Sequence, residues 1–298
     1  MNLTDGELLI AMKNVREREC LAIADVVLYL AEIDKRKLYR DAGCSSLFSY
    51  CREVLKYSEG ATHRRIQAAR IYNEQPEIYE KLKSGALSLC AIAEIARVKE
   101  MTVRAQVFVA AEGKGKQEVQ RIVAPLLPAE KSTKPQVRVK SVEVEQKREE
   151  RFHITMEVDK EFMELYEEAK RLTGTVDIRE VIKGALKTQV MKHKPKEMPI
   201  RAKKTESRVV AKSVRNAVII RDGEQCTYCS KDGVRCRERV GLEIDHVIPF
   251  GKGGRTEVQN LRVLCRSHNQ LEAERWYGKE FMQSHRHREG RSTRGKVI

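Results

Sequence analysis

The sequence predicts a multi-domain protein that is mainly α in its N-terminal region and carries a small α+β domain near its C-terminal end. At 298 residues, the chain is long enough for two or three domains with real hydrophobic cores. Only 5% of its residues are aromatic and 34% are charged, which fits a helix-rich protein better than a β-sandwich. A strand-like pattern, LEIDHVIPF, comes late in the chain and ends near Pro249.

Residues 1–127 are expected to form the all-helical domain. Thr4 and Glu7 have the spacing of a capping box, and a periodic apolar pattern follows as far as about Ile33. Gly and Pro do not interrupt that pattern after its start, so one long helix is expected. Further helices are predicted at about 76–83, 86–98, 101–112 and 116–126.

Between them, GCSSLFSYCREVLKYSEGATHRRIQAARIY predicts two helices around a short turn, with Ser58 as the N-cap of the second. The polar side of that second helix carries basic residues, among them Arg64, Arg65 and Arg70. Two interpretations stay open. The pair is either a helix-turn-helix whose second helix contacts DNA, or an ordinary helical hairpin with a solvated basic face.

We expect residues 128–298 to form several segments that differ in composition. Residues 128–150 form a charged linker with some β alternation, and 151–192 form a small β-α-α unit without evident chemistry. A basic, Pro-containing linker follows at 193–208. The C-terminal domain then covers 209–282, and 283–298 form a basic tail.

The net charge of +15 is concentrated in the C-terminal third. Residues 201–298 contain 22 Lys and Arg against 12 Asp and Glu. A basic domain of this kind suggests a phosphate-backbone partner, since Lys and Arg release counterions from a polyanion. A merely solubilising surface is the alternative.

The start of the chain does not have the pattern of a signal peptide, and no run of 18 apolar residues predicts a membrane span. We therefore expect a cytoplasmic protein with no membrane partner. In that compartment the eight cysteines are expected to be thiols or metal ligands rather than disulfides.

Four of those cysteines cluster in the C-terminal domain. Cys226 and Cys229 are separated by two residues, and Cys265 and His268 have the same gap. Two such pairs predict a tetrahedral Cys₃His site for structural Zn²⁺. Cys236 is the alternative fourth ligand, because CTYCSKDGVRC can fold as a hairpin that places Cys236 beside Cys226.

Between the zinc pairs, Asp245 and His246 suggest hydrolytic chemistry. A carboxylate can hold a hard divalent cation, and an imidazole near its ordinary pKa can remove a proton from water. Adjacent strand residues point to opposite faces, so a bend is needed for both to serve one site. Pro249 and the glycine loop from Gly251 to Gly254 could provide it.

Residues 221–278 resemble the HNH endonuclease family, whose ββα-metal fold consists of two short strands and a helix around one divalent ion. The resemblance depends on Asp-His, Gly-Gly, Asn-Leu and Leu-Cys-x-x-His-Asn in this order. The whole chain also resembles bacterial HNH proteins with a helical N-terminal domain, through stretches such as LYRDAGCSSLFSYC and RRIQAAR.

The resemblance implies a role for each motif residue. His246 is the general base, and Asp245 is the metal-binding acid before it. Asn260 holds the loop that orients His246. Asn269 ligates or positions a catalytic Mg²⁺ or Mn²⁺, so the motif is an H-N-N variant. One departure from the family concerns His268, which stands where members with a second Cys-x-x-Cys have a zinc cysteine.

The predicted function is that of a divalent-metal-dependent DNA endonuclease. Lys252 and Arg255 of the glycine loop are expected to bind DNA together with the basic residues of the N-terminal helix pair. One alternative is a non-catalytic, zinc-dependent DNA-binding protein, and another is a nuclease that acts on RNA or only within a larger complex. The sequence leaves the oligomeric state open.

Overall fold

The structure, a computed structural model, describes residues 3–127, 138–142, 151–175, 177–199 and 207–284. Parts of both expected linkers and the tail beyond Ser284 lie outside these residues. The chain divides into two compact units: unit 1 joins Met1–Leu127 to Pro195–Ile298, and unit 2 is Pro128–Lys194. Within the described ranges, no helix is long and apolar enough to cross a membrane.

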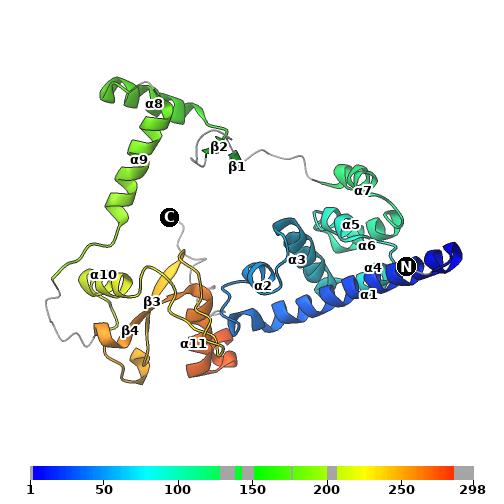
Figure 1. Cartoon of the computed structure of the whole chain (residues 1–298). Coiled ribbons are helices and arrows are strands. Elements are labelled where there is room, and N and C mark those ends of the chain that lie inside the picture. The colour runs from blue at the N-terminus through cyan, green and yellow to red at the C-terminus, as the bar shows by residue number, and fades with distance from the viewer. Residues whose placement is uncertain (1–2, 128–137, 143–150, 176, 200–206, 285–298) are drawn as a thin grey trace. The chain divides into compact units, whose positions relative to one another are not determined.

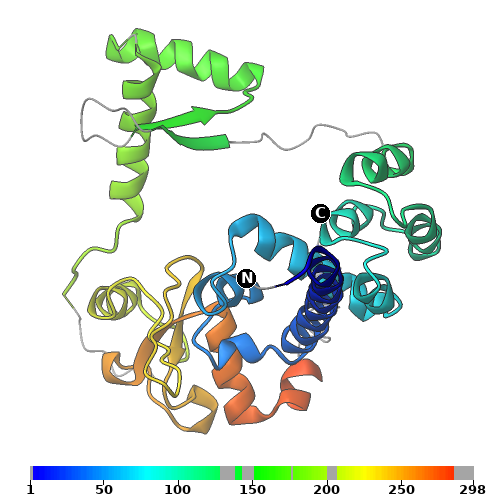
Figure 2. The same ribbon diagram turned by 45° about the vertical axis from the view of Figure 1, so that its right-hand side comes forward.

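The first part of unit 1 is helical, as predicted. It consists of α1 (Asp5–Arg36), η1 (Leu38–Arg40), α2 (Leu47–Glu53), α3 (Glu59–Glu74), α4 (Ile78–Lys83), α5 (Leu89–Ile95), α6 (Met101–Ala110), α7 (Lys116–Val123) and η2 (Ala124–Leu126). The long α1 lies alongside α3 and α4 (Figures 1 and 2).

Local sequence signals set the ends of these helices. The Thr4–Glu7 capping box that begins α1 is present, and Ser58 caps α3 through its side chain, so both predictions are confirmed. Lys37 ends α1 in the left-handed conformation, with a φ of 56°. This reversal leads into η1 and turns Arg40 toward the C-terminal domain.

Apolar side chains of the helices form two buried clusters. One, which includes Val27, Ile78, Ile92 and Phe108, joins α1 to the helices from α3 to α7. The other, which includes Leu30, Leu47 and Cys51, joins α1 to α2 and α3. The helical region therefore has its own core.

The C-terminal part of unit 1 has the predicted ββα arrangement. Strands β3 (Leu242–His246) and β4 (Leu261–Cys265) pair antiparallel, with Asp245 opposite Arg262 and His246 opposite Leu261. Helix α11 (Arg266–Tyr277) follows β4 directly. Helix α10 (Lys212–Arg221) packs on β4 through a cluster that contains Val218, Leu261 and Val263.

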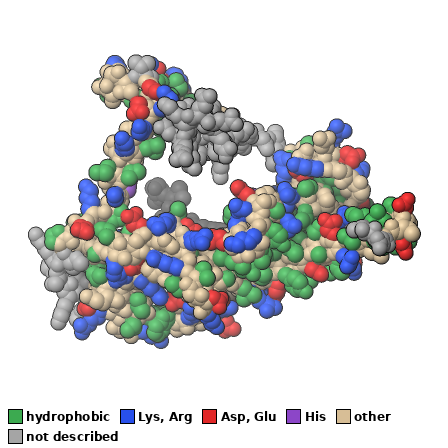
Figure 3. Space-filling model, in the orientation of Figure 1, with side chains coloured by type: hydrophobic (Ala, Val, Ile, Leu, Met, Phe, Trp, Pro, Cys, Tyr) green, Lys and Arg blue, Asp and Glu red, His purple; other side chains and the backbone are tan. Residues whose placement is uncertain are grey.

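On the face of unit 1 shown in Figure 3, Lys and Arg side chains are mixed with Asp and Glu rather than gathered into one continuous patch. Within unit 1, many Lys and Arg side chains form ion pairs, for example Arg221 with Asp222 and Arg262 with Glu272. Net charge alone therefore does not locate a nucleic-acid surface on this face.

Unit 2 contains β1 (Arg138–Val142), β2 (Arg151–Thr155), α8 (Lys160–Thr173) and α9 (Ile178–His193). The strands pair antiparallel, with Val142 opposite Arg151. Strand β2 and both helices coincide with the predicted β-α-α unit, whereas β1 lies in the segment that the sequence assigns to a linker. Both helices begin at Asp N-caps, Asp159 and Asp177.

Candidate functional site

A short hairpin between α10 and β3 brings two distant cysteines together. The amide of Cys226 donates to the carbonyl of Glu238, and the amide of Cys236 donates to the carbonyl of Tyr228, both at 2.9 Å. The turn closes through Gly233, whose φ of 77° favours glycine. Because side chains alternate along extended chains, this pairing places Cys226 and Cys236 on the same face.

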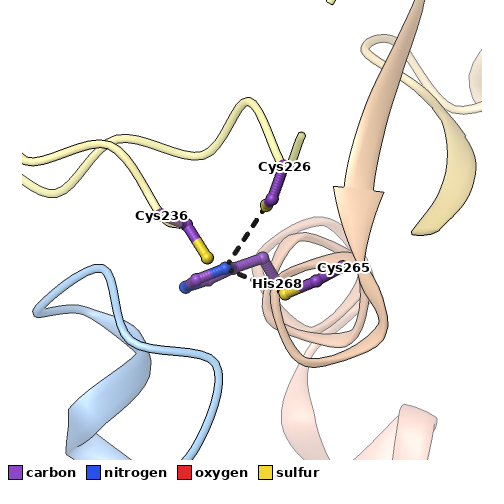
Figure 4. Close-up of side chains that lie close together, drawn as sticks. All are labelled: Cys226, Cys236, Cys265 and His268. Atoms are coloured by element: carbon purple, nitrogen blue, oxygen red, sulfur yellow. Dashed lines mark hydrogen bonds between the residues drawn. The ribbon is translucent and has the colours of Figure 1, made fainter. Parts of the chain in front are cut away.

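Four buried side chains converge beside this face (Figure 4). The Sγ atoms of Cys226, Cys236 and Cys265 and a ring nitrogen of His268 all lie within 4.8 Å of one another. Their exposed fractions are between 0 and 2%. The cysteines are free thiols. Three thiols and one imidazole at this spacing form a donor set that fits a tetrahedral zinc site.

The fourth donor in this group is Cys236 and not Cys229, which the sequence spacing favours. Cys229 is exposed, and its backbone bridges that of Arg235 across the hairpin. In an extended segment, Cys229 is an odd number of residues from Cys226, so its thiol lies on the opposite face. Cys236, which the sequence offers as the alternative fourth ligand, is therefore the cysteine that lies in the cluster.

The orientation of His268 is determined by its second nitrogen. Nε2 lies 3.0 Å from the backbone carbonyl oxygen of Arg40, which can only accept a hydrogen bond, so Nε2 carries the proton. Nδ1 then faces the thiols, at 3.5 Å from Cys226 Sγ and 3.2 Å from Cys265 Sγ. Donation from the outer ring nitrogen to a carbonyl is the usual support of a metal-binding histidine. The ring also stacks on Tyr228, with centroids 4.0 Å apart.

The thiols influence one another's protonation. Hydrogen bonds from the thiols of Cys236 and Cys265 lower the pKa of Cys226 strongly, and the same contact with Cys226 raises the pKa of Cys236 strongly. Burial opposes the charged form of His268, but hydrogen bonds to Cys226 and Cys265 outweigh it and raise the pKa of His268 to about 9. Within the cluster, Cys226 thus favours the thiolate form that binds zinc, whereas Cys236 and His268 would release their protons when a metal binds.

The N-terminal helices contact this cluster, which the sequence does not indicate. The carbonyl of Arg40 lies beside His268 Nε2, as described above. The guanidinium of Arg40 pairs with Glu274 of α11 at 2.8 Å, and both side chains are almost fully buried. Asp41 pairs with Arg275 at 2.9 Å. Ser45 donates to Glu238 at the end of the cysteine hairpin. The two parts that composition treats as separate domains therefore meet at the cysteine–histidine cluster.

On the other side of the ββα element, a cleft of about 630 Å³ lies between β3 and α11. Asp245, His246 and Asn269, three of the residues predicted to act at the active site, line this cleft. Strand β3 ends at His246, the chain then turns at Pro249, and both Asp245 and His246 line the cleft.

Two further carboxylates line the cleft, Glu243 and Glu272. Asn269 Nδ2 donates to Glu243 Oε2 at 2.6 Å, which leaves the amide oxygen of Asn269 for other partners. The sequence reasoning missed Glu243. Its signal was the alternation Glu-Ile-Asp, which places Glu243 and Asp245 on the same face of β3.

Asp245 is half-buried and lies 3.0 Å from Arg262, which also pairs with Glu272. Burial raises the pKa of Asp245, and this effect exceeds the opposing effect of Arg262. Carboxylate and amide oxygens are the donors that Mg²⁺ prefers. Asp245, Glu243 and Asn269 therefore offer the types of donor atom that a hard divalent cation prefers.

The protonation state of His246 follows from the hydrogen bonds that Thr256 makes. Thr256 Oγ1 donates to the carbonyl of Ser207 at 2.8 Å, which uses its single proton. His246 Nε2 lies 3.0 Å from the same hydroxyl and must therefore donate to it. The neutral ring then has its lone pair on Nδ1. Burial lowers the pKa of His246, which favours this neutral form.

Asn260 holds the loop that follows His246. Its amide oxygen accepts from the amide of Ile248 at 2.9 Å, and its Nδ2 donates to the carbonyls of Ile248 and Arg255 at 3.0 and 2.9 Å. Gly254 allows this close packing, since a Cβ there would lie 1.8 Å from the Ile248 carbonyl oxygen.

The basic residues predicted to bind nucleic acid differ in their surroundings. Arg65 lies over the ring of Tyr57, and Arg70 pairs with Asp34, so both have partners within the helical region. Lys252 lies 5.9 Å from the ring centroid of Tyr277 at the cleft. Arg255 is exposed and only loosely paired with Glu257.

Comparison with known proteins identifies the part of the chain that contains both sites. The family model of the HNH endonuclease matches residues 226–275, which span the cysteine hairpin, β3, the glycine loop, β4 and most of α11. Neither the curated proteins nor the solved structures include a match to the chain. Residues 226–275 of the chain are therefore an HNH endonuclease domain by this match.

Proposed function

We propose that the protein is a divalent-metal-dependent endonuclease that hydrolyses DNA phosphodiester bonds in the cleft between β3 and α11. The observation that carries the proposal is the meeting of Asp245, His246 and Asn269 in one cleft. Each residue supplies a different part of the chemistry, namely a carboxylate, a base and an amide oxygen.

His246 acts as the general base in this proposal. Its Nδ1 accepts a proton from water, while the Nε2 proton remains on the hydrogen bond to Thr256. The water oxygen forms a bond to phosphorus, and the bond from phosphorus to the 3′ oxygen breaks. The products are a 5′-phosphate and a 3′-hydroxyl, whose oxygen takes its proton from solvent.

Asp245 and Asn269, with Glu243 beside them, are the residues that would hold the catalytic Mg²⁺ or Mn²⁺. When bound, the cation supplies positive charge for the phosphate and the leaving oxygen. Asn260 contributes by holding the backbone at Ile248 and Arg255, which keeps His246 in place. Lys252 and Arg255 of the same loop, and Arg64, Arg65 and Arg70 of α3, are proposed contacts for DNA phosphates.

We further propose that Cys226, Cys236, Cys265 and His268 hold a structural Zn²⁺. The four donors are buried, and His268 already directs Nδ1 toward the thiols. Structural zinc contributes directly to the free energy of folding. The site lies at the start of α11, the helix that carries Asn269, so the zinc would fix one wall of the cleft.

The test is cleavage of supercoiled plasmid DNA by the full chain with added Mg²⁺ or Mn²⁺. We expect wild-type protein to convert supercoiled DNA to nicked or linear forms and His246→Ala to leave it intact. Both proteins should contain the same amount of zinc, which shows that the variant is folded. A reaction without added Mg²⁺ or Mn²⁺ is preferable to chelation, because a chelator can also remove zinc.

If wild type and His246→Ala bind the plasmid equally and both leave it uncut, the chain is a DNA-binding protein and the enzyme proposal is wrong. Labelled RNA and DNA of the same sequence, each tested as a single strand and as a duplex, show which nucleic acid the protein cuts. Cleavage of the RNA alone would overturn the choice of DNA.

A further inference from the structure

Aromatic rings form one wall of the proposed catalytic cleft. The chain contains one Trp and six Phe in all. That single tryptophan, Trp276, lines the cleft together with Phe250, Tyr277 and Phe281. An aromatic-poor protein thus places four rings beside the residues proposed to cut the phosphodiester.

The position of Trp276 follows from helix geometry. Asn269, Ala273 and Trp276 are spaced by four and three residues on α11, so their side chains share one face. Trp276 lies seven residues after Asn269, which is roughly 10 Å along the helix axis. A substrate bound at Asn269 can therefore reach the ring within about three stacked nucleotide steps of about 3.4 Å each.

These rings do not serve the core of the domain. None of the four belongs to the two buried clusters of the C-terminal part, which are built from the cysteine hairpin, β4 and α10. Trp276 is 45% exposed and Phe281 is 49% exposed. The rings of Tyr277 and Phe281 stack, with centroids 5.9 Å apart. Exposed, grouped rings next to a polar site indicate a binding surface.

The charges of the cleft indicate what such a surface binds. Arg208 and Arg266 line the same cleft, so their guanidinium groups can contact phosphates of a nucleic acid bound there. Aromatic faces stack on bases without regard to sequence, but only on bases that are not already enclosed in a duplex. The combination of exposed rings and guanidinium groups is the one used by proteins that bind single-stranded nucleic acid.

We propose that Trp276, supported by Tyr277 and Phe281, is a stacking subsite for an unpaired nucleobase near the scissile phosphate. This inference rests on the proposed nuclease function and narrows its substrate to single-stranded or locally unpaired DNA.

Trp276 itself reports on the proposal, because it is the only source of tryptophan fluorescence. The full chain carrying His246→Ala, with its zinc and with Mg²⁺, is titrated with three probes of equal length. These are a single-stranded DNA oligonucleotide, the same sequence as a duplex, and an abasic oligonucleotide that keeps the phosphates. We expect the single strand to quench the fluorescence and the other two to leave it nearly unchanged.

A matched pair of variants measures the contribution of the ring. Because neither variant contains tryptophan, binding is followed by the fluorescence anisotropy of a labelled oligonucleotide. Trp276→Leu, made in the same His246→Ala background, should raise the Kd for single-stranded DNA by about five- to a hundredfold, as expected for one lost stacking contact. Trp276→Phe keeps an aromatic face and should change the Kd by less than about threefold. The Kd for duplex DNA should be the same for all three proteins.

Equal quenching by duplex and single strand, or equal binding of the abasic strand, would overturn the subsite. Because these measurements record binding, they are independent of cleavage. If the wild-type protein cuts plasmid but single-stranded DNA does not quench the fluorescence, the stacking subsite is refuted and the nuclease proposal stands. If the single strand quenches the fluorescence but the wild-type protein cuts no plasmid, the nuclease proposal is refuted and the surface is one that binds single-stranded DNA.

Discussion

The Nε2 atom of His268 donates to the backbone carbonyl of Arg40 across 3.0 Å, although the two residues are 228 positions apart. This contact joins the helical region to the cysteine–histidine cluster and determines which ring nitrogen faces the thiols. The neighbouring Arg40–Glu274 ion pair is almost fully buried. The N-terminal helices therefore support the proposed zinc site from outside its ligands.

The identity of the fourth zinc ligand can be tested with two cysteine variants. Cys236→Ser should lose most of its zinc, because it removes a buried donor from the cluster. Cys229→Ser should retain about one zinc per chain, because its thiol is exposed on the other face of the hairpin. Zinc content by mass spectrometry measures both. If only Cys229→Ser loses zinc, the fourth ligand is Cys229, as the sequence spacing favours, and the assignment to Cys236 is wrong.

His268 and Asn269 are neighbours with different proposed roles. His268→Ala should lose zinc and destabilise the domain, since zinc binding contributes directly to folding. Asn269→Ala should keep zinc and the fold but reduce plasmid cutting by about a hundredfold or more, as expected when a catalytic group is lost. Zinc content, thermal unfolding and nicking rates are measured on both. An Asn269→Ala protein that cuts at the wild-type rate would refute its role.

The buried pair between Arg40 and Glu274 should contribute to the stability of unit 1. Glu274→Ala leaves the Arg40 guanidinium buried without its carboxylate, and we expect the free energy of unfolding to fall by about 3 kcal/mol. Asp41→Asn is the matched control, because its pair with Arg275 is exposed and should contribute less than about 1 kcal/mol. Urea unfolding followed by circular dichroism gives both values. Equal losses would show that the buried contact has no special importance.

Thr256 is predicted to be a positioning residue for His246. Thr256→Val removes the acceptor of the Nε2 proton, so we expect the cleavage rate at saturating DNA to fall by about tenfold or more. Thr256→Ser keeps the hydroxyl and should restore most of the rate. The Kd for DNA should be unchanged in both variants. If the Ser and Val variants are equally slow, packing rather than the hydrogen bond explains the effect.

Much of this protein can be predicted from its sequence because local signals determine it. The capping box at Thr4, the N-cap at Ser58 and the apolar periodicity act within one or two helical turns, so the helices follow from composition and spacing. Likewise, the order Asp-His, Gly-Gly, Asn-Leu and Cys-x-x-His-Asn carries the family resemblance, and the family match at 226–275 agrees with it.

The tertiary structure alone decided which donors and surfaces meet. Spacing favours Cys229, but the pleat of the hairpin turns it away and brings Cys236 to Cys226. Arg40 meets His268, and Trp276 of α11 shares a cleft with His246 of β3, only because separate segments pack together. Sequence spacing encodes local geometry, whereas contacts between distant residues depend on how whole elements bury their apolar faces.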